Sequence, residues 1–387
     1  MMKSAYNETW LYSLLVIKET KRWLKQNLIL KEQFIKINEA YTSSFYHPNL
    51  IVRILLFLAT ALALFGVTGL LVLFISEVAS PDVLLVLAFI YGVLSFFVLE
   101  KVFIQGSNHY KSGITEAFLY QAIGFTILGV SDINEHVTLL VCLIVFTGSA
   151  IRYLDLISTL AAIGFFAGVL FYECYSLGGI FEQIIPFVFI FVFTLLYFFV
   201  KKVKAQEQYK VWYNNLLIIE SMSLLLIYAG GNYLVVRELS VNMMGLQIEE
   251  GKDIPFAFIF YALTVLVPIA YLYFGIKEKD VVLLRVSLVV IAFSAFTFKY
   301  YYSLGHPEIT LTIAGLILLT ASIALLNYLK IMRHGFTRKN LLAEKLGNLN
   351  AEAFIISQTM GGNEINPISE SMPGGGSSGG AGANSSF

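Results

Sequence analysis

Ten apolar segments follow one another along most of this chain, and most of them are long enough to cross a bilayer. A spanning helix requires roughly 20 predominantly apolar residues. Charged residues make up 13% of the sequence, about half of their share in an average soluble protein. A soluble domain could not cover so much apolar surface with a polar shell. The sequence therefore predicts an all-α, polytopic transmembrane helix bundle of about ten spans over residues 50–330, surrounded by the lipid bilayer. The segments lie at about 54–75, 83–103, 114–130, 136–151, 154–173, 180–200, 216–236, 254–276, 281–298 and 309–328.

The basic residues alternate between loops in step with these segments. If the N-terminus lies inside and the number of crossings is even, only Arg237, Lys252 and Lys299 of the 26 Lys and Arg residues fall outside. Lys and Arg are concentrated in the cytoplasmic loops of membrane proteins. We therefore expect both termini in the cytoplasm. The formal net charge is zero, so nothing draws the chain to nucleic acid and no such partner is expected.

Residues 1–49 are too polar to span a membrane and carry apolar residues at helical spacing. This pattern predicts two helices, over 8–26 and 32–41, that form a hairpin. Two arrangements fit it. The hairpin lies on the cytoplasmic membrane face with Trp10 and Trp23 as interfacial anchors, or it packs against the inner loops or a partner protein.

The hairpin also contains a short sequence motif, W-x4-L-I-x2-E-Q, formed by Trp23, Leu28, Ile29, Glu32 and Gln33. With the Tyr and Pro that follow it, this pattern resembles an uncharacterised family of bacterial multi-pass membrane proteins. The resemblance covers about the first 75 residues. It implies a bacterial inner-membrane protein, and because that family has no assigned activity, it implies no chemistry.

The C-terminal part changes in composition. We expect a cytoplasmic helix over 331–360 and a disordered Gly/Ser-rich tail over 361–387, which has almost no apolar surface to bury. The tail is either an inert end or a docking tag with Phe387 as its apolar anchor. If a cytoplasmic protein partner exists, residues 1–49 or this tail are the segments expected to bind it.

Motifs for soluble-type catalysis are missing from the sequence, which has no HExxH, GxSxG or phosphate-binding loop. The five histidines are scattered, and Cys142 and Cys174 belong to no ligand-like cluster. We therefore expect no metal and no cofactor, and read both cysteines as small apolar side chains.

Tyrosines gather where segments end on the predicted outer side. Tyrosine is enriched at membrane interfaces, which accounts for most of them. A carbohydrate or lipid-headgroup site would require acidic partners among them, for which Glu173 and Glu308 are near enough in sequence. The outer aromatic candidates are Tyr172, Tyr175, Tyr228, Tyr233, Tyr300, Tyr301 and Tyr302.

Ionisable residues inside the predicted spans form the main candidate site. The segments that carry Glu220 and Arg285 both enter the membrane from the predicted cytoplasmic side, which places the two residues at similar depth. Glu116 lies nearer the cytoplasmic surface. A charge inside a span costs roughly 2.5–3.5 kcal/mol on insertion scales, so such groups usually face the bundle and pair. A Glu220–Arg285 pair would be a packing salt bridge or a proton- or substrate-handling site. Alternatively, Glu220 reaches up to cytoplasmic water.

Three functions remain open at this stage. The first is a non-enzymatic membrane scaffold or sensor that acts through its hairpin and tail. The second is a secondary transporter with a polar site around Glu220, for which Pro186, Pro268 and the sequence Gly230-Gly231-Asn232 could interrupt the helices. The third is an intramembrane enzyme acting on lipid or glycan.

Overall fold

The computed structural model describes residues 3–26, 28–76, 79–247 and 252–301, together with 315, 316, 319, 320, 323 and 327. In these residues the secondary structure is helical, apart from one isolated bridge between Tyr46 and His109. The prediction of an all-α helix bundle is confirmed. Most of the tenth predicted span, 309–328, lies outside the described residues, and all of 331–360 and 361–387 does.

The helices follow the predicted segments closely. Eight of them are long and apolar enough to cross a membrane, which makes this a multi-pass membrane protein. Helix α5 is apolar but shorter, at 15 residues. In chain order the elements are α1 Glu8–Lys25, α2 Lys31–Ala40, α3 Leu50–Ser76, α4 Pro81–Val98, the π-helical η1 Leu99–Gly106, α5 Ile114–Leu128, α6 Glu135–Tyr153, α7 Leu156–Leu177, α8 Ile180–Lys204, the 3-10 segment η2 Glu207–Trp212, α9 Tyr213–Gly231, α10 Tyr233–Asn242, α11 Ala257–Glu278 and α12 Val281–Tyr301.

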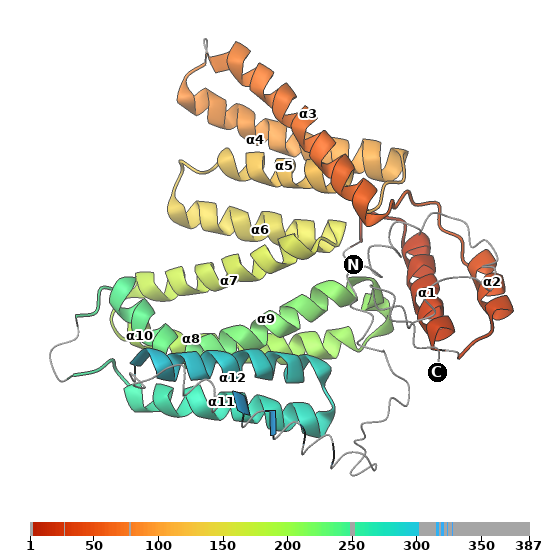
Figure 1. Cartoon of the computed structure of the whole chain (residues 1–387). Helices are drawn as coiled ribbons and strands as arrows, with labels where there is room; N and C mark the ends of the chain where they lie inside the picture. The colour runs from red at the N-terminus through yellow and green to blue at the C-terminus, as the bar shows by residue number, and fades with distance from the viewer. Residues whose placement is uncertain are drawn as a thin grey trace.

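The long helices run back and forth between two ends of the bundle (Figure 1). One end carries α1 and α2 together with the loops predicted to lie inside, and we call it the hairpin end. The opposite end carries the loops predicted to lie outside. Successive loops thus lie at opposite ends of the bundle, as the distribution of Lys and Arg residues along the sequence predicts.

Small residues let neighbouring helices approach closely, as is typical of membrane bundles. A Cβ atom added to Gly92 of α4 would lie 2.5 Å from the backbone nitrogen of Thr126, and one added to Gly129 would lie 2.6 Å from that of Phe89. The contact between α4 and α5 therefore depends on these two glycines. Within a bilayer, such close packing replaces the hydrophobic driving force that is missing between helices in lipid.

The hairpin is docked on the bundle. Tyr6, Leu11 and Phe45 are buried in one apolar cluster with residues of η1 and α5, such as Leu99 and Leu119. The Ala5 amide donates a hydrogen bond to a carbonyl at the end of α6, over 2.8 Å. Of the two predicted arrangements, the one seen is a hairpin packed against the inner loops.

The two hairpin tryptophans differ in their surroundings. Trp10 meets Phe45 edge to face, with ring centroids 5.2 Å apart. Trp23 is 44% exposed and remains available for an interface.

Candidate functional site

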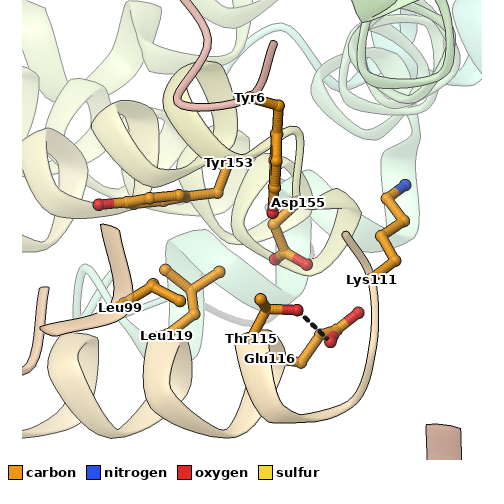
Figure 2. A pocket seen from close by; sticks show the side chains of 8 residues that line it. All are labelled: Tyr6, Leu99, Lys111, Thr115, Glu116, Leu119, Tyr153 and Asp155. Carbon is orange, nitrogen blue, oxygen red and sulfur yellow. Dashed lines mark hydrogen bonds between the residues drawn. The ribbon is translucent and has the colours of Figure 1, made fainter. Parts of the chain in front are cut away.

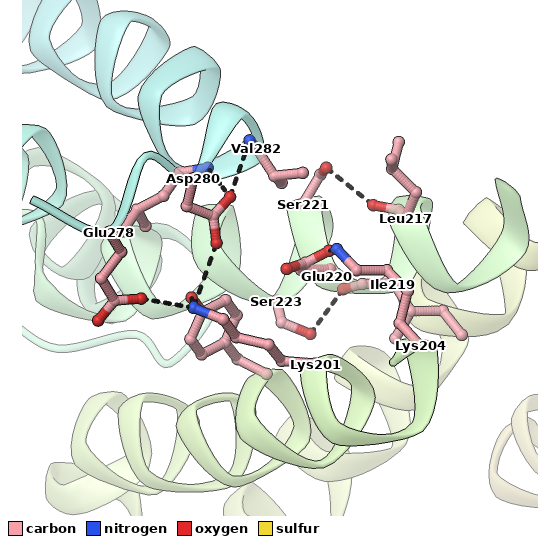
Figure 3. A network of polar contacts seen from close by, with 12 residues as sticks. Lys201, Lys204, Leu217, Ile219, Glu220, Ser221, Ser223, Glu278, Asp280 and Val282 are labelled. Atoms are coloured by element: carbon pink, nitrogen blue, oxygen red, sulfur yellow. Dashed lines mark hydrogen bonds and ion pairs between the residues drawn. The ribbon is translucent and has the colours of Figure 1, made fainter. Parts of the chain in front are cut away.

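Glu220 is the most deeply buried carboxylate of the predicted site. It lies on α9 and has no exposed surface. The 3-10 segment η2 reverses the chain between α8 and α9, which places the last residue of α8, Lys204, beside it (Figure 3). The Lys204 ammonium donates to Oε2 of Glu220. The other oxygen, Oε1, is buried without a hydrogen-bond partner.

This pair is incompletely satisfied for a buried carboxylate. An ionised carboxylate offers about four acceptor positions, and an unpaired buried polar atom costs about 1–3 kcal/mol. The Lys204 side chain retains 17% exposure, so its long stem connects the buried acid to the hairpin-end surface. Glu220 is thus held by one cation that is itself partly exposed to solvent.

The predicted pair between Glu220 and Arg285 is wrong. Arg285 is exposed on α12, and its place beside the acid is taken by Lys204. The buried face of α12 carries Leu283, Val286 and Val290 at helical spacing. Because each residue turns an α-helix by about 100°, Arg285 falls on a different face.

Glu116 is placed in a separate cluster, beside the hairpin (Figure 2). Its Oε1 accepts from Arg53 at 2.5 Å, and its Oε2 accepts from the Gly113 amide at 2.7 Å and the Thr115 hydroxyl at 2.8 Å. These bonds satisfy both oxygens and cap the start of α5. Glu116 therefore ties α5 to the start of α3.

A small cavity opens beside Glu116. Its volume is about 10 Å³, room for about one water molecule. Burial raises the pKa of Tyr6 well above its usual range and lowers the pKa of Lys111, both of which line the cavity. The site holds no space for a substrate and serves the hairpin joint.

A second ion-pair network lies next to Glu220 and was not predicted from the sequence. Lys201 lies between Glu278, at 2.7 Å, and Asp280, at 3.2 Å, and so joins α8 to the α11–α12 turn (Figure 3). Burial acts to raise the pKa of Asp280, but the Leu283 amide and Lys201 outweigh it and lower that pKa below its usual range. The signal in the sequence was the run of lysines at the end of α8 opposite two acids. Charge counts assign such residues to a side of the membrane and to no partner.

The far end of α9 is interrupted as Gly230-Gly231-Asn232 suggested, so residues 216–236 are not one continuous span. Helix α9 ends at Gly231, and α10 begins after Asn232. Asn232 is fully buried, and its Nδ2 donates to the Tyr228 hydroxyl at 2.8 Å and to Thr297 Oγ1 at 3.0 Å. The break is therefore stabilised by side chains inside the bundle.

Buried polar groups continue along α9 from one end to the other. We call them the α9 polar stripe: Asn215, Glu220, Ser223, Tyr228 and Asn232. They extend over about 25 Å at 1.5 Å per residue. Buried hydroxyls of α11 and α12 accompany the stripe, contributed by Thr264, Ser287, Ser294 and Thr297. Apart from Glu220, these polar groups make hydrogen bonds within the protein.

The outer tyrosines do not form one cluster. Tyr172 stacks on His136, which contacts Glu173, and Tyr175 stacks on Phe171. The remaining tyrosines divide between the bundle interior and a second group. Tyr228 bonds Asn232 inside the bundle. Tyr301 lies beside Tyr233, and Tyr300 lies beside Tyr301. Tyr302 and Glu308 lie outside the described residues.

Acidic partners do meet the tyrosines around Tyr233, although not the ones expected. The hydroxyls of Tyr233 and Tyr261 each donate to Asp253 at 2.9 Å, and Tyr301 donates to Glu238 at 3.3 Å. Asp253 is therefore occupied by hydrogen bonds from the protein itself. Its separation of 20 residues from Tyr233 hid this contact from sequence patterns.

Cys142 and Cys174 are buried free thiols. Among the described residues, no group of three or more His, Cys, Asp or Glu side chains could hold a metal ion. Comparisons with family models, with curated proteins and with solved structures return no match.

Proposed function

We propose that this protein is a secondary transporter whose coupling group is Glu220. The observation that supports this proposal is the state of the Glu220 carboxylate. It is fully buried in a membrane helix, one of its oxygens is unpaired, and it is held by a single partly exposed lysine. Ionisable residues inside membrane spans usually mark substrate or proton pathways. Discontinuous helices are typical of transporter binding sites, and the α9–α10 break supplies one on the same helix as Glu220, about 17 Å further along it at 1.5 Å per residue.

The proposed cycle uses the geometry of this pair. With Glu220 ionised, Lys204 neutralises it and closes the hairpin-end side of the α9 polar stripe. When a proton binds Oε1, the carboxyl group becomes neutral and releases Lys204 towards solvent. In this proposal the protein lies in a bacterial inner membrane with its hairpin end facing the cytoplasm throughout the cycle, in line with the distribution of basic residues.

A hydrophobic carbodiimide tests the site directly, because it modifies protonated carboxyl groups in apolar surroundings. We expect intact-mass labelling of the wild type near neutral pH and its loss in Glu220→Gln. Glu207→Gln, at a side chain 81% exposed, is the matched control and should label like the wild type.

Proteoliposomes with a trapped pH dye test transport itself. Addition of amino acids, sugars or inorganic cations should move protons for at least one solute class, and Glu220→Gln should abolish that movement while Glu207→Gln retains it. Absence of carbodiimide labelling at Glu220, together with no solute-driven proton movement, would overturn the proposal.

A scaffold is the second function with an observation in its favour. The docked hairpin presents exposed apolar side chains, including Trp23 at 44%, Leu28 at 52% and Leu30 at 68%, and exposed apolar groups of this kind mark interaction surfaces. If a cytoplasmic partner binds there, Leu30→Glu should abolish its co-purification in mild detergent without affecting proton movement.

A further inference from the structure

An open groove runs along α6 on the bundle surface, away from the α9 polar stripe. Its volume is about 610 Å³. The walls are almost entirely apolar, with Leu143, Ile144 and Ile151 among them, and two basic residues, Lys3 and Arg152, stand at the hairpin end. The groove is thus apolar along its length and cationic at one end.

The groove has the length of one leaflet. From Leu143 to Arg152 it covers nine residue steps, about 14 Å of helix, which is close to half of the roughly 30 Å hydrocarbon thickness of a bilayer. Gly148 forms part of its floor, and a Cβ atom added there would meet nothing within 4 Å. Glycine inside a helix costs roughly 0.5–1 kcal/mol relative to Ala, and no close helix contact requires it here. Its effect is to leave the groove open.

The charges at the hairpin end favour an anion. Arg152 donates to Glu100 through Nε and Nη2, at 2.8 and 2.5 Å, and to the Lys3 carbonyl through Nη1 at 3.2 Å. Lys101 is joined to the same carboxylate through Gln105. Glu100 is therefore paired directly with Arg152 and linked to Lys101 through Gln105, and two N–H groups of the Arg152 guanidinium remain available.

We propose that this groove binds an anionic phospholipid of the leaflet at the hairpin end. One acyl chain lies along α6 over Gly148, and the phosphate lies between Lys3 and Arg152. Basic pockets at the cytoplasmic ends of membrane helices recognise anionic headgroups in this way. The bound lipid would fasten the N-terminal segment, through Lys3, to the end of α6, where Ala5 and Arg152 are already joined.

Native mass spectrometry of the full chain, titrated with phosphatidylglycerol or phosphatidylcholine in detergent, tests the proposal. The wild type should bind the first phosphatidylglycerol more tightly than the first phosphatidylcholine. Lys3→Gln should weaken phosphatidylglycerol binding about fivefold, the equivalent of about 1 kcal/mol per basic residue, and leave phosphatidylcholine binding unchanged. Gly148→Leu should weaken the binding of both lipids, because the leucine side chain fills the groove. Neither change disturbs the Glu100–Arg152 pair.

Two matched controls separate this site from the general lipid-facing surface. Gly164→Leu, at an exposed α7 position that also has nothing within 4 Å, and Lys31→Gln, at the exposed start of α2, should bind both lipids like the wild type. The proposal is overturned if the wild type has no preference for phosphatidylglycerol, if Lys3→Gln has no effect, or if Gly164→Leu weakens binding as much as Gly148→Leu.

Discussion

Glu116 and Glu220 are both buried acids at the hairpin end of apolar helices, and each is held by one basic side chain. They differ in how completely they are satisfied. Glu116 accepts three hydrogen bonds shared between its two oxygens, whereas Glu220 accepts one and leaves Oε1 bare. A fully bonded buried carboxylate fixes a structure, and a partly bonded one keeps the capacity to bind a proton or cation. The following predictions test that difference.

The largest effect is expected at the backbone that holds Glu116. Gly113 has φ = 94°, and a Cβ atom there would lie 2.1 Å from the Arg53 carbonyl oxygen. Gly113→Ala should therefore cost about 3–5 kcal/mol through backbone strain and overpacking, measured as loss of thermal stability in detergent. Gly124→Ala on the same helix, with nothing within 4 Å, should be neutral or slightly stabilising. Equal stability of the two variants would contradict the structure of this joint.

Replacing each carboxylate by an amide should show a difference in stability between Glu116 and Glu220. Glu116→Gln replaces one of the two oxygens that accept the bonds from Arg53, the Gly113 amide and the Thr115 hydroxyl, and should destabilise by about 2–4 kcal/mol. Glu220→Gln loses one hydrogen bond and frees a lysine that can reach solvent, so its cost should stay below about 1 kcal/mol. Chemical denaturation in mixed micelles measures both. If Glu220→Gln costs as much as Glu116→Gln, the pair with Lys204 is a structural salt bridge and the transport proposal loses its support.

Acidification should weaken the hairpin joint and leave the Glu220 region intact. His109 pairs with Tyr46 across the joint and contacts the Ser112 hydroxyl at 2.9 Å. Burial lowers the pKa of His109, so the folded state binds fewer protons than the unfolded one. Stability from this residue is therefore complete above about pH 6.5, the unfolded value, and is lost as pH falls through the lower folded value.

Hydrogen exchange measures this loss locally. Amides of α1 and α2 should lose protection between pH 7.5 and 5.5, corrected for intrinsic rates, while those of α9 do not. The His109→Gln variant should reduce the pH dependence. An unchanged profile in that variant would assign the effect to another group.

The smallest effect is expected at Arg285. Because its side chain is exposed on α12, Arg285→Gln should change stability by less than about 0.5 kcal/mol and leave carbodiimide labelling of Glu220 unchanged. A double-mutant cycle with Glu220→Gln should be additive, whereas the cycle with Lys204→Gln should not. Coupling to Arg285 would mean that α12 rotates relative to α9.

Much of the fold was predictable from the sequence because it depends on local composition. Apolar length predicts spanning helices, and the Gly-Gly-Asn sequence predicted the interruption after α9, since glycine costs helix stability and Asn caps the next turn. Helix α5 was harder, because its 15 residues are short for a bilayer. The docking of the hairpin stayed open, since the same apolar stripe fits a membrane surface or a protein surface equally well.

The sequence by itself determined that this chain is a multi-pass membrane helix bundle and that Glu220 lies within one of its long apolar helices. Only the tertiary structure decided that Lys204 meets this acid, that Asp253 meets Tyr233, and that Glu116 is sealed by Arg53. The physical reason is that apolar composition does not specify how a lipid-embedded helix is rotated about its axis. Each residue step rotates the partner by about 100°, so the partner of a buried charge is fixed by packing and by the turns between helices.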